Sequence, residues 1–235
     1  MCQTVILTSM FKRIFFIVFV LLLGFAVDTD AQSQLYPTNR FSRVYSDSDF
    51  IDLKRYDLIF DELLLSDIEN ANFAFTVQPS WGAESSCSYC PSKSTFVLKV
   101  AEENLWYYYF GVNSEFVAGE SPEVNIVEYR CVVPWETAKH FKELFSAAAL
   151  SSSYLARPNG LDGVTYEIIS LKDGWVTAGF WSPKKDTNCH KLEQILIQIS
   201  LAVRSNDCSA IEELVPAAVE LTAAFKELYP ADVIE

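Results

Sequence analysis

Cysteine and histidine are the residue types in this 235-residue chain that could carry nucleophilic, redox or metal chemistry, and it holds six and two of them. Cys87 and Cys90 form a Cys-x-x-Cys motif, the spacing of redox-active thiol pairs. Such a pair needs its first thiolate at a helix N-terminus that follows a strand. Pro91 comes directly after the second cysteine, and the flanking residues 80–93 have the composition of a loop. The motif is therefore predicted to be structural rather than redox-active.

The same motif supplies one half of a zinc site, whose second half would come from Cys189 and His190. The four side chains together are a suitable tetrahedral set, because thiolates and imidazole nitrogens are the usual zinc ligands. Only the first pair has the spacing that zinc sites use. A thiol-redox or zinc-dependent enzyme centred on residues 87–90 is therefore the alternative hypothesis. Under the leading hypothesis, no cofactor and no metal are expected.

Disulfide bonds are the default expectation for the cysteines of an exported chain. Cys189 and Cys208 lie at opposite ends of a predicted helix, roughly 20–25 Å apart, which is beyond disulfide reach. Cys87 and Cys90 are expected to take part in bridges, with each other or with a more distant cysteine. The pairing is left open, and an odd cysteine remains among the five that follow the N-terminal segment: Cys87, Cys90, Cys131, Cys189 and Cys208.

Signatures of other enzyme classes are missing from the sequence. It has no nucleophile elbow, no His-Glu-x-x-His zinc motif, no phosphate-binding loop and no dinucleotide fingerprint. Acid pairs such as Glu102 and Glu103 are adjacent, so they would point apart in a helix or a strand. His140 lies among charged residues and is predicted to be solvated. The sequence therefore favours a protein that is not an enzyme, and no motif is specific enough to indicate a family.

An aromatic run, Trp106-Tyr107-Tyr108-Tyr109-Phe110, is the strongest candidate for a binding surface. We predict a strand here, in which Tyr107 and Tyr109 face one side of the sheet and Trp106 the other. An exposed tyrosine row would supply rigid contact area with polar tips. Trp106, Tyr107 and Tyr109 are therefore the candidate binding residues. The alternative is a central strand whose two faces are both packed.

The elements that would position these residues follow from hydrophobic periodicity and turn signals. Short connections between the strands imply antiparallel pairing. The prediction is an α+β fold, in which an antiparallel sheet of about six strands carries helices on one face. The expected order is four strands (72–77, 95–100, 105–112 and 124–133), a helix (135–150), two strands (164–168 and 175–181) and two helices, the last over 209–229.

The clearest of these elements lie between Gly163 and Val203. The two strands are joined by an Asp-Gly turn at residues 173–174, a strong hairpin signal. Gly179 is predicted to mark a bulge or a close backbone approach. Asp186 or Thr187 would cap the helix that follows. In the last helix, Ser209 with Glu212 fits a capping box, and Pro216 should split or kink it.

The N-terminal segment has the pattern of a secretory signal peptide. Lys12 and Arg13 precede an uncharged apolar run over residues 14–27, and small residues follow it. Cleavage is expected after Ala31 or, as a second choice, after Ala26, while an uncleaved anchor is the alternative. The domain prediction is thus a signal peptide (1–31), an exposed leader (32–49) and a single α+β domain (50–235). Export to the periplasm, the cell surface or the medium is expected, with no stable membrane span after cleavage.

The formal net charge of −13 argues against nucleic acid as a partner, because phosphates would be repelled. A basic protein would be attracted. The leading hypothesis is an exported, non-catalytic domain that binds another macromolecule, and an inhibitor or immunity protein is one concrete form. A small-ligand carrier with a pocket between sheet and helices is a further alternative.

Overall fold

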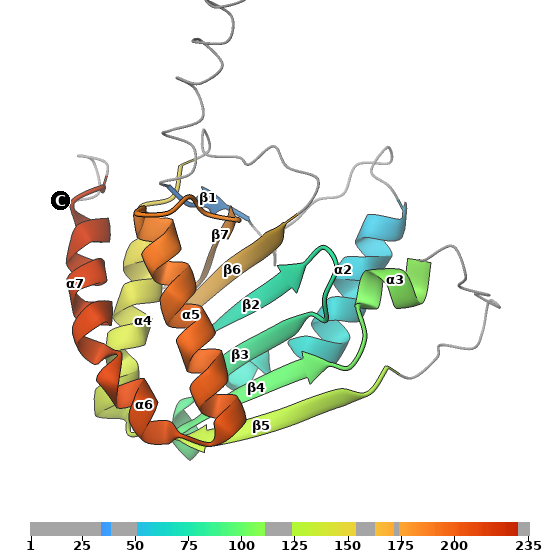
Figure 1. The fold of residues 1–235 in the computed structure, drawn as a ribbon, viewed down its shortest axis with the longest axis horizontal. Coiled ribbons are helices and arrows are strands. Elements are labelled where there is room, and N and C mark those ends of the chain that lie inside the picture. The colour runs from blue at the N-terminus through green and yellow to red at the C-terminus, as the bar shows by residue number, and fades with distance from the viewer. Residues whose placement is uncertain (1–33, 39–50, 111–123, 154–162, 172–173, 230–235) are drawn as a thin grey trace, which may run out of the picture.

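A computed structural model describes residues 34–38, 51–110, 124–153, 163–171 and 174–229 (Figure 1). The expected signal peptide and the Lys172-Asp173 part of the predicted hairpin turn lie outside these residues. The structure confirms the α+β class: one antiparallel sheet has seven strands in the order β1-β7-β6-β2-β3-β4-β5. The strands are β1 Tyr36–Pro37, β2 Phe73–Pro79, β3 Ser85–Cys90, β4 Thr95–Ala101, β5 Ile126–Val132, β6 Val164–Leu171 and β7 Trp175–Trp181.

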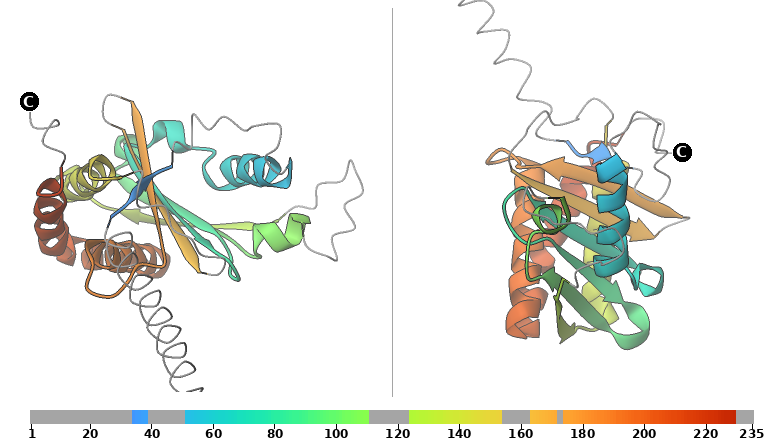
Figure 2. Two further views of the ribbon diagram at one scale, coloured as in Figure 1. Left: turned by 90° about the horizontal axis from the view of Figure 1, so that it is seen from above. Right: turned by 90° about the vertical axis from the view of Figure 1, so that its right-hand side faces the viewer.

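Helices cover both faces of the sheet (Figure 2). One face carries α4 Trp135–Leu150, α5 Asn188–Ser205, α6 Cys208–Glu213 and α7 Val215–Lys226. The opposite face carries α2 Ile51–Leu64 and α3 Leu105–Phe110, and short 3-10 turns lie at Ile68–Asn70 and Pro91–Lys93. The helices of the C-terminal half thus share one face, as predicted, while α2 and α3 add a layer on the other.

Alternation along β2 divides the interior into two clusters. Phe73 and Phe75 join the larger cluster beneath α4 and α5, whereas Ala74 joins a smaller cluster beneath α2 and α3. Such a division follows from the period of two, which sends successive side chains to opposite faces. Aromatic rings dominate the larger cluster: the ring of Phe73 stacks on Tyr89 at 5.4 Å and meets the edge of Phe145 at 5.4 Å between centroids.

The hairpin of β6 and β7 and the helix after it are confirmed. Thr187 caps α5 by accepting the N–H of His190, which satisfies a donor that the first helical turn leaves free. The apolar side chains of α5 recur at helical spacing and form one stripe that is buried in the larger cluster: Leu192, Ile195, Leu196, Ile199 and Val203. Gly179 marks a close approach, because a Cβ there would lie 2.8 Å from Cγ2 of Thr38 and 3.1 Å from the carbonyl oxygen of Tyr166. The predicted split at Pro216 is also confirmed, since α6 ends before it and α7 begins beside it.

Three assignments differ from the sequence-based predictions. Residues 85–90 form β3 rather than a loop, and residues 105–110 form α3 rather than a strand. Part of the expected leader belongs to the fold, because Leu35 is fully buried and Tyr36 pairs with Gly179 of β7. The cap of α6 also differs: Asp207 accepts the N–H of Ala210, so the predicted capping box is wrong.

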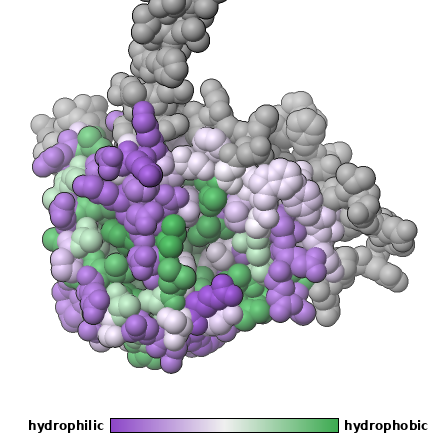
Figure 3. Space-filling model, in the orientation of Figure 1, coloured by the Kyte–Doolittle hydropathy of each residue, from purple (hydrophilic) through white to green (hydrophobic). Residues whose placement is uncertain are grey.

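The surface on the α5 side mixes hydrophilic and apolar residues rather than presenting one continuous apolar patch (Figure 3). Across the residues that the structure describes, no helix is long and apolar enough to cross a membrane.

Candidate binding surface at helix α3

Asn104 lies directly before helix α3, and its side chain makes contacts in two directions. Its Oδ1 accepts the N–H of Tyr107 at 2.9 Å, which is the geometry of a helix cap. Its amide nitrogen donates to the carbonyl oxygens of Gly82 at 2.6 Å and Pro79 at 3.3 Å. The start of α3 is therefore tied to the loop between β2 and β3.

Glu84 fixes the same region from beneath. Its side chain is 1% exposed, and its two carboxylate oxygens accept the N–H of Leu105 at 2.8 Å and the hydroxyl of Tyr56 at 3.0 Å. Burial raises the pKa of Glu84, although these hydrogen bonds act in the opposite direction. One carboxylate thus joins the start of α3, helix α2 and the start of β3.

Three large aromatic side chains remain in contact with solvent above this anchor. Trp81 is 72% exposed and Tyr107 is 46% exposed, and their rings stack with centroids 5.5 Å apart. Trp106 is 37% exposed and meets the ring of Tyr56 edge-on at 5.5 Å. We name Trp81, Trp106 and Tyr107 the α3 patch. Exposed aromatic groups of this kind are enriched in binding surfaces.

The structure changes how the predicted binding residues are arranged. The expected strand would have set Tyr107 and Tyr109 side by side, whereas in α3 Tyr109 turns inward and is only 6% exposed. Its burial also raises its pKa. Trp106 and Tyr107, adjacent on a helix, both reach solvent. The tyrosine row is therefore wrong as a geometry, and Tyr109 serves the packing of α3 instead.

Trp81 was missed by the sequence analysis because it stands alone in a polar loop. Its neighbour Gly82 and the serines around it predict a turn and give no sign of a ring partner 26 positions away. The loop is brought against α3 by contacts that join distant positions: Asn104 donates to the carbonyls of Gly82 and Pro79, and Glu84 accepts the N–H of Leu105.

The sequence that follows Lys99 and includes part of the patch is acidic. Between Lys99 and Arg130 the chain has no basic residue and no histidine, but it has Glu102, Glu103, Glu115, Glu120, Glu123 and Glu128. Glu102 and Glu103, just before α3, are both exposed. Glu115, Glu120 and Glu123 lie outside the described residues. Two exposed carboxylates thus lie directly before α3, while the exposed Lys54 and Arg55 adjoin Tyr56 on α2.

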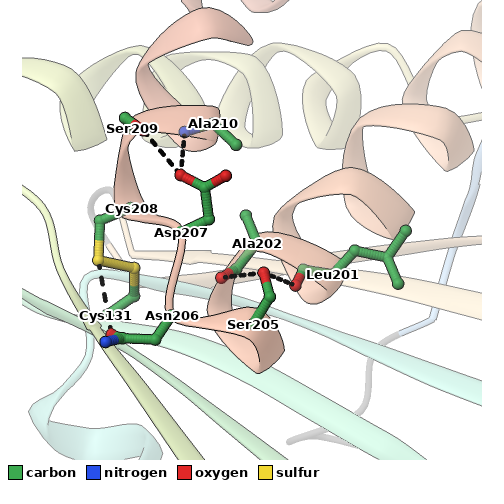
Figure 4. The surroundings of a disulfide bond; sticks show 9 residues. All are labelled: Cys131, Leu201, Ala202, Ser205, Asn206, Asp207, Cys208, Ser209 and Ala210. Atoms are coloured by element: carbon green, nitrogen blue, oxygen red, sulfur yellow. Dashed lines mark hydrogen bonds between the residues drawn. A yellow bond between two sulfur atoms is a disulfide. The ribbon is translucent and has the colours of Figure 1, made fainter.

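Among the described residues one disulfide bond is present, between Cys131 of β5 and Cys208 of α6, with a sequence separation of 77 and a Cα–Cα distance of 5.6 Å (Figure 4). Cys87, Cys90 and Cys189 are free. The exclusion of a bond between Cys189 and Cys208 is thus confirmed, while the expectation that Cys87 and Cys90 form bridges is wrong. The reason is β3: residues three apart on a strand point to opposite faces and cannot close a bridge.

The free thiols give the alternative enzyme hypothesis no support. Burial raises the pKa of the Cys189 thiol to about 12, and it raises the pKa of the Cys87 thiol still more strongly. Both groups are therefore protonated at neutral pH, whereas a nucleophilic or metal-bound cysteine is a thiolate. No group of three or more His, Cys, Asp or Glu side chains converges as metal ligands within the described part of the chain.

No protein-family model, curated protein or solved structure matches this chain. The α3 patch and the cysteines are therefore the features from which a function can be inferred.

Proposed function

We propose that the protein is an exported, non-catalytic domain that binds a basic protein partner at the α3 patch. The observation that carries this proposal is the exposed stack of Trp81 on Tyr107, held by hydrogen bonds that Asn104 donates to Gly82 and that Glu84 accepts from Leu105. Rings that are fixed before binding lose little conformational freedom when a partner arrives, so their contact area contributes fully to affinity. An inhibitor or immunity protein is the concrete form that this proposal favours.

The charge around the patch argues for a basic partner. An arginine or lysine side chain gains a cation–π interaction over the face of Trp81 or Tyr107, and long-range attraction from the surrounding carboxylates. Nucleic acid has the flat bases that would stack on such rings, but its phosphates would be repelled by the same carboxylates. Arginine-rich segments of a protein can both stack on the aromatic rings and be attracted by the carboxylates.

Export is supported by two independent features. The N-terminal sequence has the order of a signal peptide, with basic residues, an apolar run and a small residue at its end. The bond between Cys131 and Cys208 is of the kind that persists in oxidising compartments. A non-catalytic domain outside the cytoplasm would meet basic partner proteins there.

Calorimetric titration with a deca-arginine peptide tests the proposal. We expect saturable binding that weakens by about tenfold or more in the double variant Trp81→Ala/Tyr107→Ala, because the two rings form the centre of the surface. The matched control is Leu201→Ala, which removes an exposed apolar side chain from α5. A deca-glutamate peptide should not bind.

Equal affinity of the double variant and the unaltered protein would contradict the proposal, because the peptide would then be attracted by net charge alone. Far-UV circular dichroism of both variants checks that the fold is retained.

A further inference from the structure

Strand β5 forms one edge of the sheet and has no strand partner on its outer side among the described residues. Its seven residues pair with β4 in one uninterrupted antiparallel register from Ile126 to Val132. Natural proteins protect such edges with charged side chains, especially lysine, with proline or bulges, or by keeping the strand very short. The opposite edge of this sheet is short, because β1 has two residues. By contrast, β5 is long and contains no lysine and no proline, and its two charged residues, Glu128 and Arg130, neutralise each other in an ion pair.

Two hydrogen bonds show which backbone groups of β5 point outward. The N–H of Val133 donates to Ser94 at 2.8 Å, and the carbonyl of Asn125 accepts the N–H of Glu102 at 3.0 Å. Odd-numbered residues therefore direct their backbone groups toward β4. Because direction alternates along an antiparallel strand, even-numbered residues direct theirs to the open edge. These residues are Ile126, Glu128, Arg130 and Val132.

We propose that this edge binds a second copy of the same chain, β5 against β5, around a two-fold axis at Tyr129. In that register Glu128 faces the partner's Arg130, and Ile126 faces the partner's Val132. All four pairs of outward-pointing residues then exchange backbone hydrogen bonds, because each joins two even-numbered positions. The two sheets become one continuous antiparallel sheet.

Charge selects this register over its two neighbours. An axis at residue 128 would set Glu128 against the partner's Glu128, and an axis at residue 130 would set Arg130 against the partner's Arg130. Like charges directly opposite each other on a sheet are destabilising, whereas opposite charges are stabilising. Only the axis at Tyr129 pairs each carboxylate with a guanidinium of the other chain.

The side chains on the two faces of β5 suit this arrangement. Glu128 and Arg130 already form an ion pair within one chain, with Oε1 and Nη2 2.6 Å apart, and both are exposed. Pairing would extend this ion pair into an alternating group of four charges. Val132, 68% exposed, would lose solvent contact against the partner's Ile126. On the other face, Tyr129 lies beneath the guanidinium of Arg204 at 5.7 Å and would stand at the axis.

Sedimentation velocity over a range of protein concentrations tests the proposal with charge reversals. The unaltered protein should shift from monomer to dimer as its concentration rises. Glu128→Arg and Arg130→Glu, made singly, place like charges across the axis and should weaken the dimer by about tenfold or more. The double exchange Glu128→Arg/Arg130→Glu restores both opposite-charge pairs and should restore the dimer.

The matched control is Glu143→Arg, which reverses an exposed charge on α4, away from the edge. It changes net charge as much as Glu128→Arg and should leave the dimer intact. A protein that stays monomeric at every concentration would overturn the proposal. So would a dimer that the single reversals leave unchanged, or a folded double exchange that stays monomeric.

Discussion

Glu84 is a buried carboxylate whose charge the fold tolerates because Tyr56 and Leu105 donate to it. Burial raises its pKa above the usual 4.5. The folded state therefore holds this proton more tightly than the unfolded chain does. The stability that follows is fully present below the unfolded pKa and is lost as pH rises through the folded pKa.

Replacing Glu84 by glutamine should flatten the pH dependence of the free energy of unfolding in the range above the ordinary carboxyl pKa of 4.5. The glutamine carbonyl can still accept the N–H of Leu105, and its amide can donate to the oxygen of Tyr56. Glu84→Ala leaves both partners unpaired and should cost roughly 2–4 kcal/mol. Urea unfolding across this pH range measures both effects, with exposed Glu103→Gln as the control. An unchanged pH slope in Glu84→Gln would contradict this account.

At the scale of single elements, strand β3 determines how the two cysteines of the Cys-x-x-Cys motif are oriented and how far each is exposed. Cys87 points into the larger cluster and is buried, whereas Cys90, at the end of the strand, is partly exposed. Cys189 is buried in the first turn of α5. Because the motif lies in a strand, its two thiols point to opposite faces and differ in solvent exposure, unlike the thiols of a redox pair.

Alkylation of the native protein at neutral pH, followed by peptide mapping, should modify Cys90 first. Cys87 and Cys189 should react only after unfolding, because their thiols are buried and protonated. Cys131 and Cys208 should react only after reduction. Rapid modification of Cys87 in the folded protein would contradict the structure and revive the enzyme hypothesis.

The sequence predicted elements whose local pattern agrees with their surroundings. Strands β6 and β7 show the alternation of a strand, and α5 shows the spacing of an amphipathic helix. Packing against neighbouring elements then buries the apolar faces that these patterns already define. Helix α3 differs, since its aromatic residues favour strands by intrinsic preference. Contacts with Asn104 and Glu84 decide for a helix. Asn104, a favoured N-cap residue three positions before Tyr107, was the local signal available, whereas the contact of Glu84 with Leu105 is not visible in the local sequence.

Strand β3 was hidden for the opposite reason. Its serines and cysteines have the composition of a loop, yet Cys87 and Tyr89 alternate with polar residues and both face the larger cluster. On the other face, the hydroxyl of Ser86 finds its hydrogen-bond partner in a tertiary contact, because it donates to the carbonyl oxygen of Leu64 at 2.5 Å. Because this strand was not predicted, the opposite directions of the Cys87 and Cys90 side chains were not predicted either, and a bridge between them was not excluded.

For the whole molecule, the bond between Cys131 and Cys208 ties the edge strand β5 to the C-terminal helices. The bond joins residues 77 positions apart in the sequence. A disulfide that closes a long loop removes more conformational entropy from the unfolded chain than one that closes a short loop. The double variant Cys131→Ser/Cys208→Ser should lose about 4 kcal/mol of stability. Its thermal midpoint should fall by about 10 °C.

Differential scanning calorimetry measures this change, and Cys90→Ser, which removes a free thiol, is the matched control. An equal thermal midpoint for the double variant and the unaltered protein would show that the bond adds nothing to the folded state.

The strand order also has a consequence for how the chain folds during synthesis. Phe73 of β2 pairs with Ser170 of β6, so two central neighbours of the sheet come from distant parts of the sequence. A nascent chain that ends before β6 leaves one side of β2 without its partner, although Phe145 of α4 can already pack on the rings of Phe73 and Phe75. Contacts of such long range form slowly, because the intervening chain must first be brought together. The sheet can therefore be completed only after β6 and β7 have emerged from the ribosome.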